Sequence, residues 1–233
     1  MALNALKNLD EHILAFFDIS PSPKTRRIMR LLSIGAMITA ALAVSYWGYQ
    51  LYAGNREKNA QKELAACMEL YEKAAGAGEM ATLWPSVEMA CKLGHERYSG
   101  SSLAPYFLSY QADALIKQNK MDEAITIMNE MVHALSPRSP LYHVYATKHA
   151  LMQMDATDNA VRAAGLLALE KLAADTNNEQ RDEALYYLGL YHWHNNDASQ
   201  AKEAWQTLMS LPGSPEYNSP WISLVTERLK LLA

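Results

Sequence analysis

A long apolar stretch near the N-terminus constrains this chain more than any other feature. It extends from Ile28 to Ala53, and the 23 residues from Leu31 onward carry no charge. As a helix they would span roughly 34 Å, enough to cross the hydrocarbon core of a bilayer, which is about 30 Å thick. The C-terminal end is rich in aromatic residues, as in the belt at a membrane–water interface: Tyr46, Trp47, Tyr49 and Tyr52. We therefore interpret residues 28–53 as a transmembrane anchor.

Two other interpretations of this stretch are less consistent with its composition. One is a buried helix in the core of a soluble domain. The other is a cleavable signal peptide, but the apolar region is longer and begins later than such a peptide requires. It also ends in bulky aromatic residues, where a cleavage site needs small ones. We expect an anchor that is not cleaved.

The basic residues around the anchor predict its orientation. Four precede it and two follow it, in the order Lys24, Arg26, Arg27, Arg30, then Arg56 and Lys58. Because positive charge is retained on the cytoplasmic side, we expect residues 1–27 in the cytoplasm and residues 54–233 across the membrane. The expected location is the inner membrane of a bacterium, with the C-terminal domain in the periplasm. A eukaryotic organelle is the alternative.

The first 20 residues have apolar side chains near helical spacing and are followed by Ser20-Pro21-Ser22-Pro23. This pattern predicts a short amphipathic helix on the cytoplasmic membrane surface or against a partner. A flexible tail is the alternative.

The two cysteines, Cys67 and Cys91, fall on two consecutive predicted helices, about 56–75 and 81–98. They are symmetric about the intervening turn, so an antiparallel helix pair would place them at the same height. A disulfide would fit an oxidising compartment outside the cytoplasm. The alternative is two reduced cysteines buried as small apolar residues. It stays open because the position of a residue along a helix pair does not determine the direction in which its side chain points.

Beyond the anchor, helical patterns follow one another between short breaks, and no stretch alternates as a strand would. The predicted fold class is all-α: an N-terminal transmembrane helix followed by an α-solenoid of helix pairs. Two segments, 104–136 and 184–213, carry small residues twelve apart at matching places. These are Ala112 and Ala124 in the first and Gly189 and Ala201 in the second. A third, degenerate unit spans 139–175, where Ala146 follows Ala112 by 34 residues, and a capping helix is expected at 219–233.

These spacings resemble the tetratricopeptide repeat (TPR), including the Leu188-Gly189 pair, although His192 stands where the motif usually has Tyr. The whole layout is similar to the YfgM-like ancillary subunits of the bacterial Sec translocon. It shares with them a short cytoplasmic segment, one signal anchor, a small TPR domain and a last helix with Arg228, Leu229 and Leu232. The resemblance implies a role in binding the translocon and periplasmic chaperones.

In a TPR protein the first helix of each pair lines a groove. On this alignment the groove residues are Tyr106, Ser109, Asp113 and Ile116 in one repeat and Tyr186, Leu190 and Trp193 in the other. Aromatic groups beside a few polar ones suit the capture of a peptide. Alternatively, the capping helix or a loop covers these residues as ordinary core.

No residues arranged for catalysis or for a cofactor are recognisable. His192 and His194 are two apart and point to different helix faces, and there is no His-Glu-x-x-His, phosphate loop or Cys-x-x-Cys. We expect no metal, no cofactor and no enzyme activity. The net charge of -4 also argues against nucleic acid. We expect protein partners, bound in the membrane through the anchor and outside it through the groove. One alternative is an assembly factor or structural subunit of a bacterial membrane or secretion complex. Another is a membrane-tethered enzyme.

Overall fold

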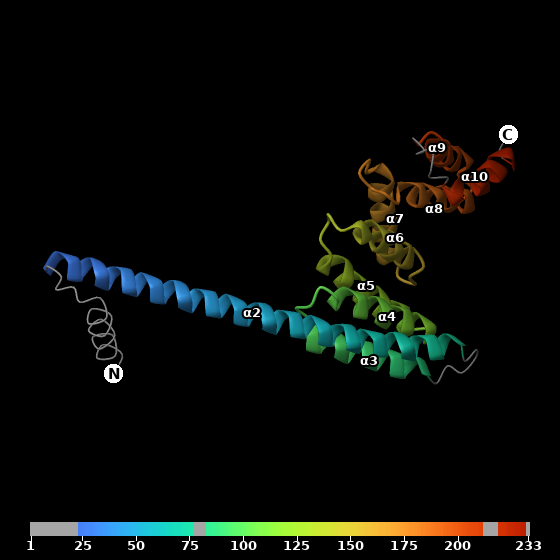
Figure 1. Ribbon diagram of the computed structural model, residues 1–233. Helices are drawn as coiled ribbons and strands as arrows, with labels where there is room; N and C mark the ends of the chain where they lie inside the picture. Colours follow the sequence, from blue (N-terminus) through green and yellow to red (C-terminus); the bar gives the residue numbers. More distant parts are fainter. Residues whose placement is uncertain (1–22, 77–82, 212–218, 232–233) are drawn as a thin grey trace. The chain divides into compact units, whose positions relative to one another are not determined.

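The computed structural model describes residues 23–76, 83–211 and 219–231 (Figure 1). Within these ranges the chain forms nine helices and no strand, which confirms the all-α prediction. The expected amphipathic helix at 1–20 lies outside the described residues. The helices are α2 (Pro23–Gly76), α3 (Trp84–Tyr98), α4 (Ala104–Lys117), α5 (Met121–Ala134), α6 (Pro140–Met154), α7 (Asn159–Ala174), α8 (Arg181–His194), α9 (Ala198–Met209) and α10 (Pro220–Leu231).

Several helices begin where the sequence supplies a capping side chain. Ser139, Asp158 and Asp197 each accept a hydrogen bond from a backbone N–H group in the first turn of the helix that follows. These bonds satisfy donors that a helix start otherwise leaves free. Proline occupies an early position in α3, α4 and α6, where its missing N–H costs nothing.

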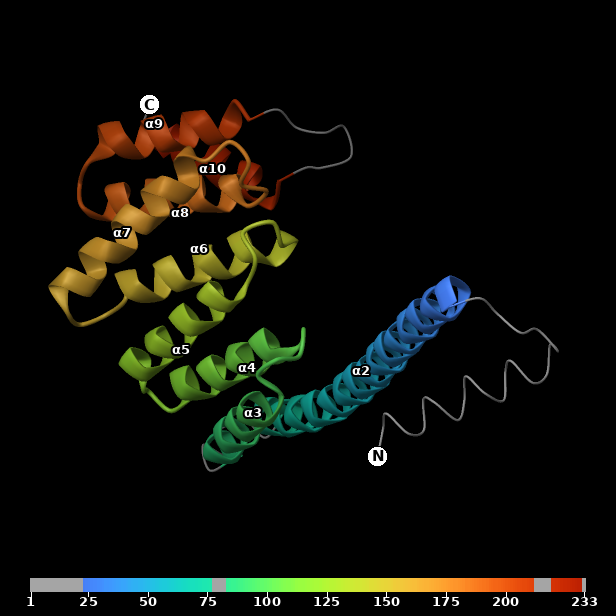
Figure 2. The same ribbon diagram turned by 90° about the vertical axis from the view of Figure 1, so that its left-hand side faces the viewer.

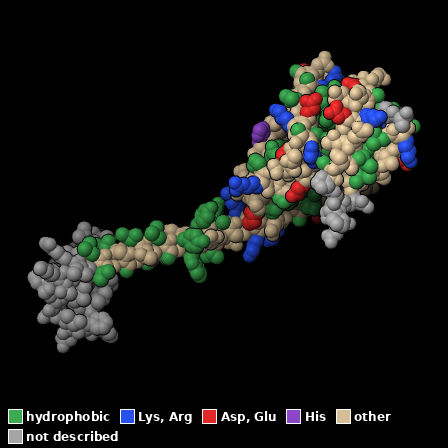
Figure 3. All heavy atoms as spheres, turned by 90° about the horizontal axis from the view of Figure 1, so that it is seen from above, with side chains coloured by type: hydrophobic (Ala, Val, Ile, Leu, Met, Phe, Trp, Pro, Cys, Tyr) green, Lys and Arg blue, Asp and Glu red, His purple; other side chains and the backbone are tan. Residues whose placement is uncertain are grey.

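The chain divides into two units, Met1–Arg56 and Glu57–Ala233. In the first unit, the described residues are the first part of α2. From Leu31 to Tyr52 every side chain except Ser33 is exposed, and Figure 3 shows hydrophobic side chains gathered along this segment. Leu32 is 68% exposed and Trp47 is 72% exposed, so the segment is not a core helix. Among the described residues, α2 is the one helix long and apolar enough to cross a membrane.

In the second unit, each helix from α3 to α9 packs against the next one along the chain, and α10 packs on α8 and α9 (Figure 2). Three apolar clusters lie between the helices. The first joins α3 and α4 to the last part of α2 and contains Phe107. The second lies mainly between α4 and α5, around Met128. The third joins α6 to α10 around Trp205.

Small residues allow the paired helices to approach closely, as the sequence predicts. Ala112 and Ala124 are fully buried where α4 crosses α5. Gly189 and Ala201 hold the same places between α8 and α9, 77 residues later. A Cβ atom on Gly189 would lie 2.2 Å from Nε1 of Trp205, so only glycine fits beneath the indole.

The turns that close these two pairs are also equivalent. Asn119 and Asn196, again 77 residues apart, have the left-handed φ values of 62° and 59°. In both turns the next residue donates its N–H to a carbonyl five residues earlier, at 2.9 Å, from Lys120 to Leu115 and from Asp197 to His192. This is the Schellman pattern of helix termination, in which asparagine is the usual substitute for glycine.

The middle pair, α6 and α7, uses different small residues from those expected. Ala146 is only half-buried, whereas Ala150, one helical turn later, is fully buried. A Cβ atom on Gly165 would lie 2.7 Å from the carbonyl oxygen of Ala150. The closest approach of these helices is therefore one turn further along α6 than the 34-residue spacing predicts.

Candidate protein-binding face

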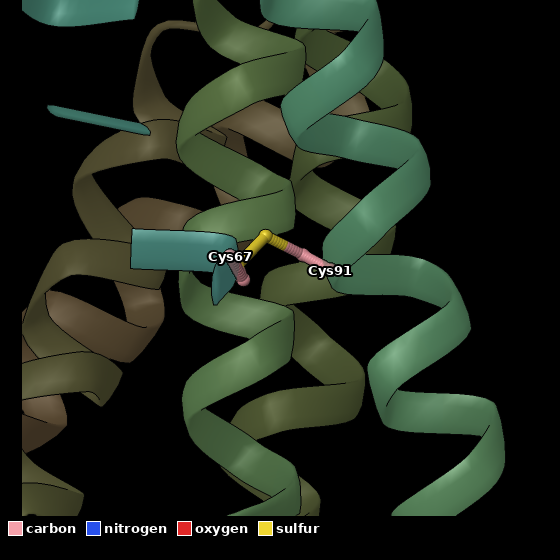
Figure 4. The surroundings of a disulfide bond; sticks show 2 residues. All are labelled: Cys67 and Cys91. Atoms are coloured by element: carbon pink, nitrogen blue, oxygen red, sulfur yellow. A yellow bond between two sulfur atoms is a disulfide. The ribbon is translucent and has the colours of Figure 1, made fainter. Parts of the chain in front are cut away.

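The last part of α2 is held against α3 by a disulfide between Cys67 and Cys91, whose side chains point toward each other (Figure 4). The two Cα atoms are 5.4 Å apart, within the usual range for this bond. Both cysteines are buried, at 1% and 0% exposure. The bond therefore lies inside the apolar cluster that also contains Phe107, where it fixes α2 beside α3.

Polar contacts join the same two segments at the surface. Arg97 in α3 donates a hydrogen bond to Glu63 in α2 at 2.9 Å. The Ser101 hydroxyl, just after α3, donates to the Glu57 carboxylate at 2.8 Å. Both contacts lie before the disulfide along α2. They extend the attachment over several helical turns.

Most side chains of α4 are buried, but one stripe remains half-exposed. Tyr106, Tyr110 and Asp113 lie three or four residues apart and therefore share a helix face. Tyr106 and Asp113 are two of the predicted groove residues. Of the other two, Ser109 is 9% exposed and Ile116 packs against the α4–α5 cluster. The structure thus buries Ser109 and leaves the other three residues of the predicted α4 set half-exposed.

The stripe on α4 continues onto the neighbouring first helices. The rings of Tyr110 and Tyr71, which lies in α2, are 5.2 Å apart and meet edge to face. On the other side, Lys148 of α6 donates a hydrogen bond to Asp113 at 2.6 Å. We call the set Tyr71, Tyr110, Asp113, Tyr145 and Lys148 the tyrosine face.

Partial burial, helped by nearby groups, raises the pKa of two phenols of this face. Partial burial raises the pKa of Tyr71, and the charge of Asp113 raises it further. Partial burial is also the main cause that raises the pKa of Tyr110, followed by the nearby Tyr145 and Asp113. The phenols of Tyr71 and Tyr110 therefore stay neutral at physiological pH, and each can donate and accept hydrogen bonds.

Of the predicted groove residues of α8, Tyr186 is buried, whereas Leu190 and Trp193 are half-buried. Tyr186 is 6% exposed because its ring stacks on Trp221 of α10, with the ring centres 4.5 Å apart. Its carbonyl accepts a hydrogen bond from Nε1 of Trp205 at 3.2 Å. Leu190 and Trp193 pack against the same cluster. The assignment of Tyr186 to an open groove is therefore corrected: α10 covers it, as the capping-helix alternative anticipated.

Sequence reasoning missed Tyr71, Tyr110, Tyr145 and Lys148, although a signal for three of them was present. Tyr110 lies one turn from Tyr106 on the same face of α4. Tyr145 follows Tyr110 by 35 residues, and Lys148 follows Asp113 by the same interval, which is close to the repeat period. Tyr71 carried no comparable signal because the helix that contains it did not align with a repeat.

No three His, Cys, Asp or Glu side chains within the described ranges lie close enough together to hold a metal ion. His192 and His194 occupy the last turn of α8, where a basic side chain can interact favourably with the helix dipole. What the described residues offer is a surface of aromatic and charged groups. Compared with protein-family models, curated proteins and solved structures, the chain gave no match.

Proposed function

We propose that this chain is a membrane-anchored adaptor with a TPR-like domain, which binds other proteins and performs no catalysis. The TPR-like assignment is supported by the equivalence of α4–α5 and α8–α9. The two pairs share small residues at the crossing, including Gly189, and asparagine at the left-handed turn position. Helix pairs of this kind stack into a solenoid whose first helices line one surface.

The proposed location is the periplasmic side of a bacterial inner membrane. The observation that carries it is the buried disulfide between Cys67 and Cys91, a short distance along the chain from the apolar part of α2. Disulfides persist in oxidising compartments and are rare in the cytoplasm. The basic residues before the anchor support the same orientation.

The proposed partners are the Sec translocon, through the anchor, and a periplasmic chaperone or client, through the tyrosine face. Partly buried tyrosines beside a charged pair supply large, rigid contact area with hydrogen-bonding groups. Tyrosine is enriched among the residues that dominate binding energy at interfaces. The proposed role is that of an accessory subunit of the translocon, in line with the resemblance of the sequence layout.

The first experiment tests orientation and the disulfide together. A reporter that is active only outside the cytoplasm is fused after Ala233, and the product is run on non-reducing and reducing gels. We expect reporter activity and a mobility shift that Cys67→Ser abolishes. An inactive reporter would place the second unit in the cytoplasm and end the Sec proposal.

The second experiment identifies the complex. The full chain is purified in mild detergent after crosslinking in cells, and its partners are identified by mass spectrometry. Recovery of translocon subunits with periplasmic chaperones is the expected result. Recovery of the components of another secretion complex instead would replace the translocon role by that of an assembly factor.

A further inference from the structure

The disulfide between Cys67 and Cys91 lies on the buried faces of the two helices that it joins. On α3, Val87, Cys91 and Gly94 are three or four residues apart and share one buried face. On α2, Cys67 and Ala74 are seven residues apart, which places them on one face, and both are buried. The two sulfur atoms therefore lie in the seam between these faces.

Helix α4 packs across this seam and contacts both helices. The ring of Phe107 lies against Gly94 of α3, so closely that a Cβ atom on this glycine would overlap the ring. The ring of Tyr110 meets the ring of Tyr71 of α2 edge to face, with the ring centres 5.2 Å apart. Each contact lies one helical turn after the cysteine of its helix. Because Phe107 and Tyr110 are neighbours on the surface of α4, one side of this helix closes the seam.

This cover determines how the disulfide can react. In thiol–disulfide exchange a thiolate attacks a sulfur atom directly, so the reaction requires access to that atom. Cys67 is 1% exposed and Cys91 is 0% exposed, so neither sulfur atom is accessible in the folded chain. The disulfide itself ties α2 to α3. Of the helices that supply the described residues of this cluster, α4 is the one that the bond does not hold, so α4 has to move to give access.

We propose that α4 is a cover that sets the order of events at this disulfide. The bond forms first, while α4 is still unpacked, and α4 then closes over it. After that, a thiol reduces the bond only through states in which α4 has opened. The disulfide is therefore a structural bond in the folded chain and not a switch that responds to surrounding thiols. This order holds whichever partner the chain binds.

The oxidant in the first step is an external disulfide. The thiolate of one cysteine attacks a sulfur atom of that disulfide, so its S–S bond breaks, a mixed disulfide forms and the other sulfur leaves as a thiolate. The thiolate of the second cysteine then attacks the cysteine sulfur of the mixed disulfide. This closes the bond between the two cysteines and releases the remaining sulfur of the oxidant. The cysteines lose two electrons, the oxidant gains them, and the two thiol protons pass through solvent to the released thiolates.

The first test is the rate at which dithiothreitol reduces the disulfide of the full chain in detergent. Free thiols are trapped with an alkylating agent at intervals and counted by mass spectrometry. We expect reduction in buffer to be about a hundredfold slower, or more, than in concentrated urea, where the seam is open. Rates that agree within about threefold would mean that the sulfur atoms are accessible in the folded chain, which would overturn the proposal.

Two variants test whether α4 is the cover. Phe107→Ala removes the ring over Gly94 and should speed reduction by about tenfold or more, because α4 then opens more often. Tyr110→Ala removes the contact with α2 and should also speed reduction, and it replaces Phe107→Ala if that variant does not fold. Tyr191→Ala changes a half-buried tyrosine of α8 and is the matched control, with the rate unchanged. A wild-type rate in the folded α4 variants would exclude α4 as the cover.

The second test follows formation of the bond. The reduced chain is unfolded in urea and returned to detergent buffer, and oxidised glutathione is added either at once or after refolding. We expect the disulfide to form about a hundredfold more slowly in the refolded chain. A reduced chain that refolds only after the oxidant is added would support the same order. Equal rates of bond formation before and after refolding would overturn it.

Discussion

The disulfide between Cys67 and Cys91 should account for a large, local share of the stability of the second unit. The cysteines are 24 residues apart in sequence. Closing a loop of that length removes about 3.5 kcal/mol of conformational freedom from the unfolded chain at 25 °C. This contribution is a substantial fraction of the 5–15 kcal/mol that typically stabilises a folded domain. We therefore expect the packing of the last part of α2 against α3 to depend on the disulfide.

The perturbation that tests this is the double substitution Cys67→Ala and Cys91→Ala. Alanine is preferable to serine because both positions are buried, and a serine hydroxyl there would need a new hydrogen bond. Reducing the wild-type chain gives a second form, which loses the bond but keeps both sulfur atoms. The difference in stability between the double variant and the reduced wild type measures the packing lost with the sulfur atoms. The difference between the reduced and the oxidised wild type measures the contribution of the cross-link itself.

The assay is hydrogen exchange of the full chain in detergent, read separately for α3 and α9. We expect the opening free energy of α3 to fall by about 3.5 kcal/mol in the reduced wild type, with α9 nearly unchanged. Helix α9 packs on α8 and α10, away from the disulfide along the chain, so it serves as an internal control. A loss below about 1 kcal/mol in α3, or an equal loss in α9, would refute the reasoning.

Three further predictions concern packing, turns and pH. Gly189→Ala should destabilise the chain by about 1–3 kcal/mol in urea unfolding, since its Cβ would overlap the buried indole of Trp205; Gly54→Ala, with open space around it, should not. Asn119→Ala should cost about 1 kcal/mol and Asn119→Gly nothing, because residue 119 has a φ of 62°. Burial holds the pKa of His149 below 6.5, so the unfolded chain binds more protons and stability falls as pH drops below that value. The slope contributed by this histidine is at most about 1.4 kcal/mol per pH unit, and His149→Phe should remove it, as thermal melts from pH 7 to pH 5 would show.

Much of the fold could be predicted because its signals are local. The helix limits follow from breaks such as Asn119 and from caps such as Ser139, which act within one turn of the chain. The uncharged stretch after Leu31 identifies α2 as the apolar helix by composition alone. The heights of Cys67 and Cys91 also follow from counting residues about a turn.

The direction in which a side chain faces could not be predicted in the same way, because it depends on which helices come together. The residues that line the groove in an ideal repeat include Ser109 of α4, which is buried here. The shift from Ala146 to Ala150 in α6 is another example, set by the close approach of Gly165. Burial of Tyr186 depends on Trp221, which is 35 residues away and belongs to no repeat.

Tyr186, a predicted groove residue that α10 covers, and Tyr110, a member of the tyrosine face, should respond differently to substitution. Tyr186 is stacked on Trp221 and lies in the core, so Tyr186→Ala should cost about 3–5 kcal/mol of stability in urea unfolding. Tyr110 is half-exposed, so Tyr110→Ala should cost much less stability. If the tyrosine face binds the partner, however, Tyr110→Ala should weaken capture by about 2 kcal/mol, or about thirtyfold.

Tyr98, a half-buried tyrosine of α3 outside the tyrosine face, is the matched control, and Tyr98→Ala should leave capture unchanged. The measurement is the affinity of each folded variant for the partner recovered by crosslinking. Full capture by Tyr110→Ala would exclude Tyr110 from the interface. Binding would then have to use a surface other than the one around Tyr110.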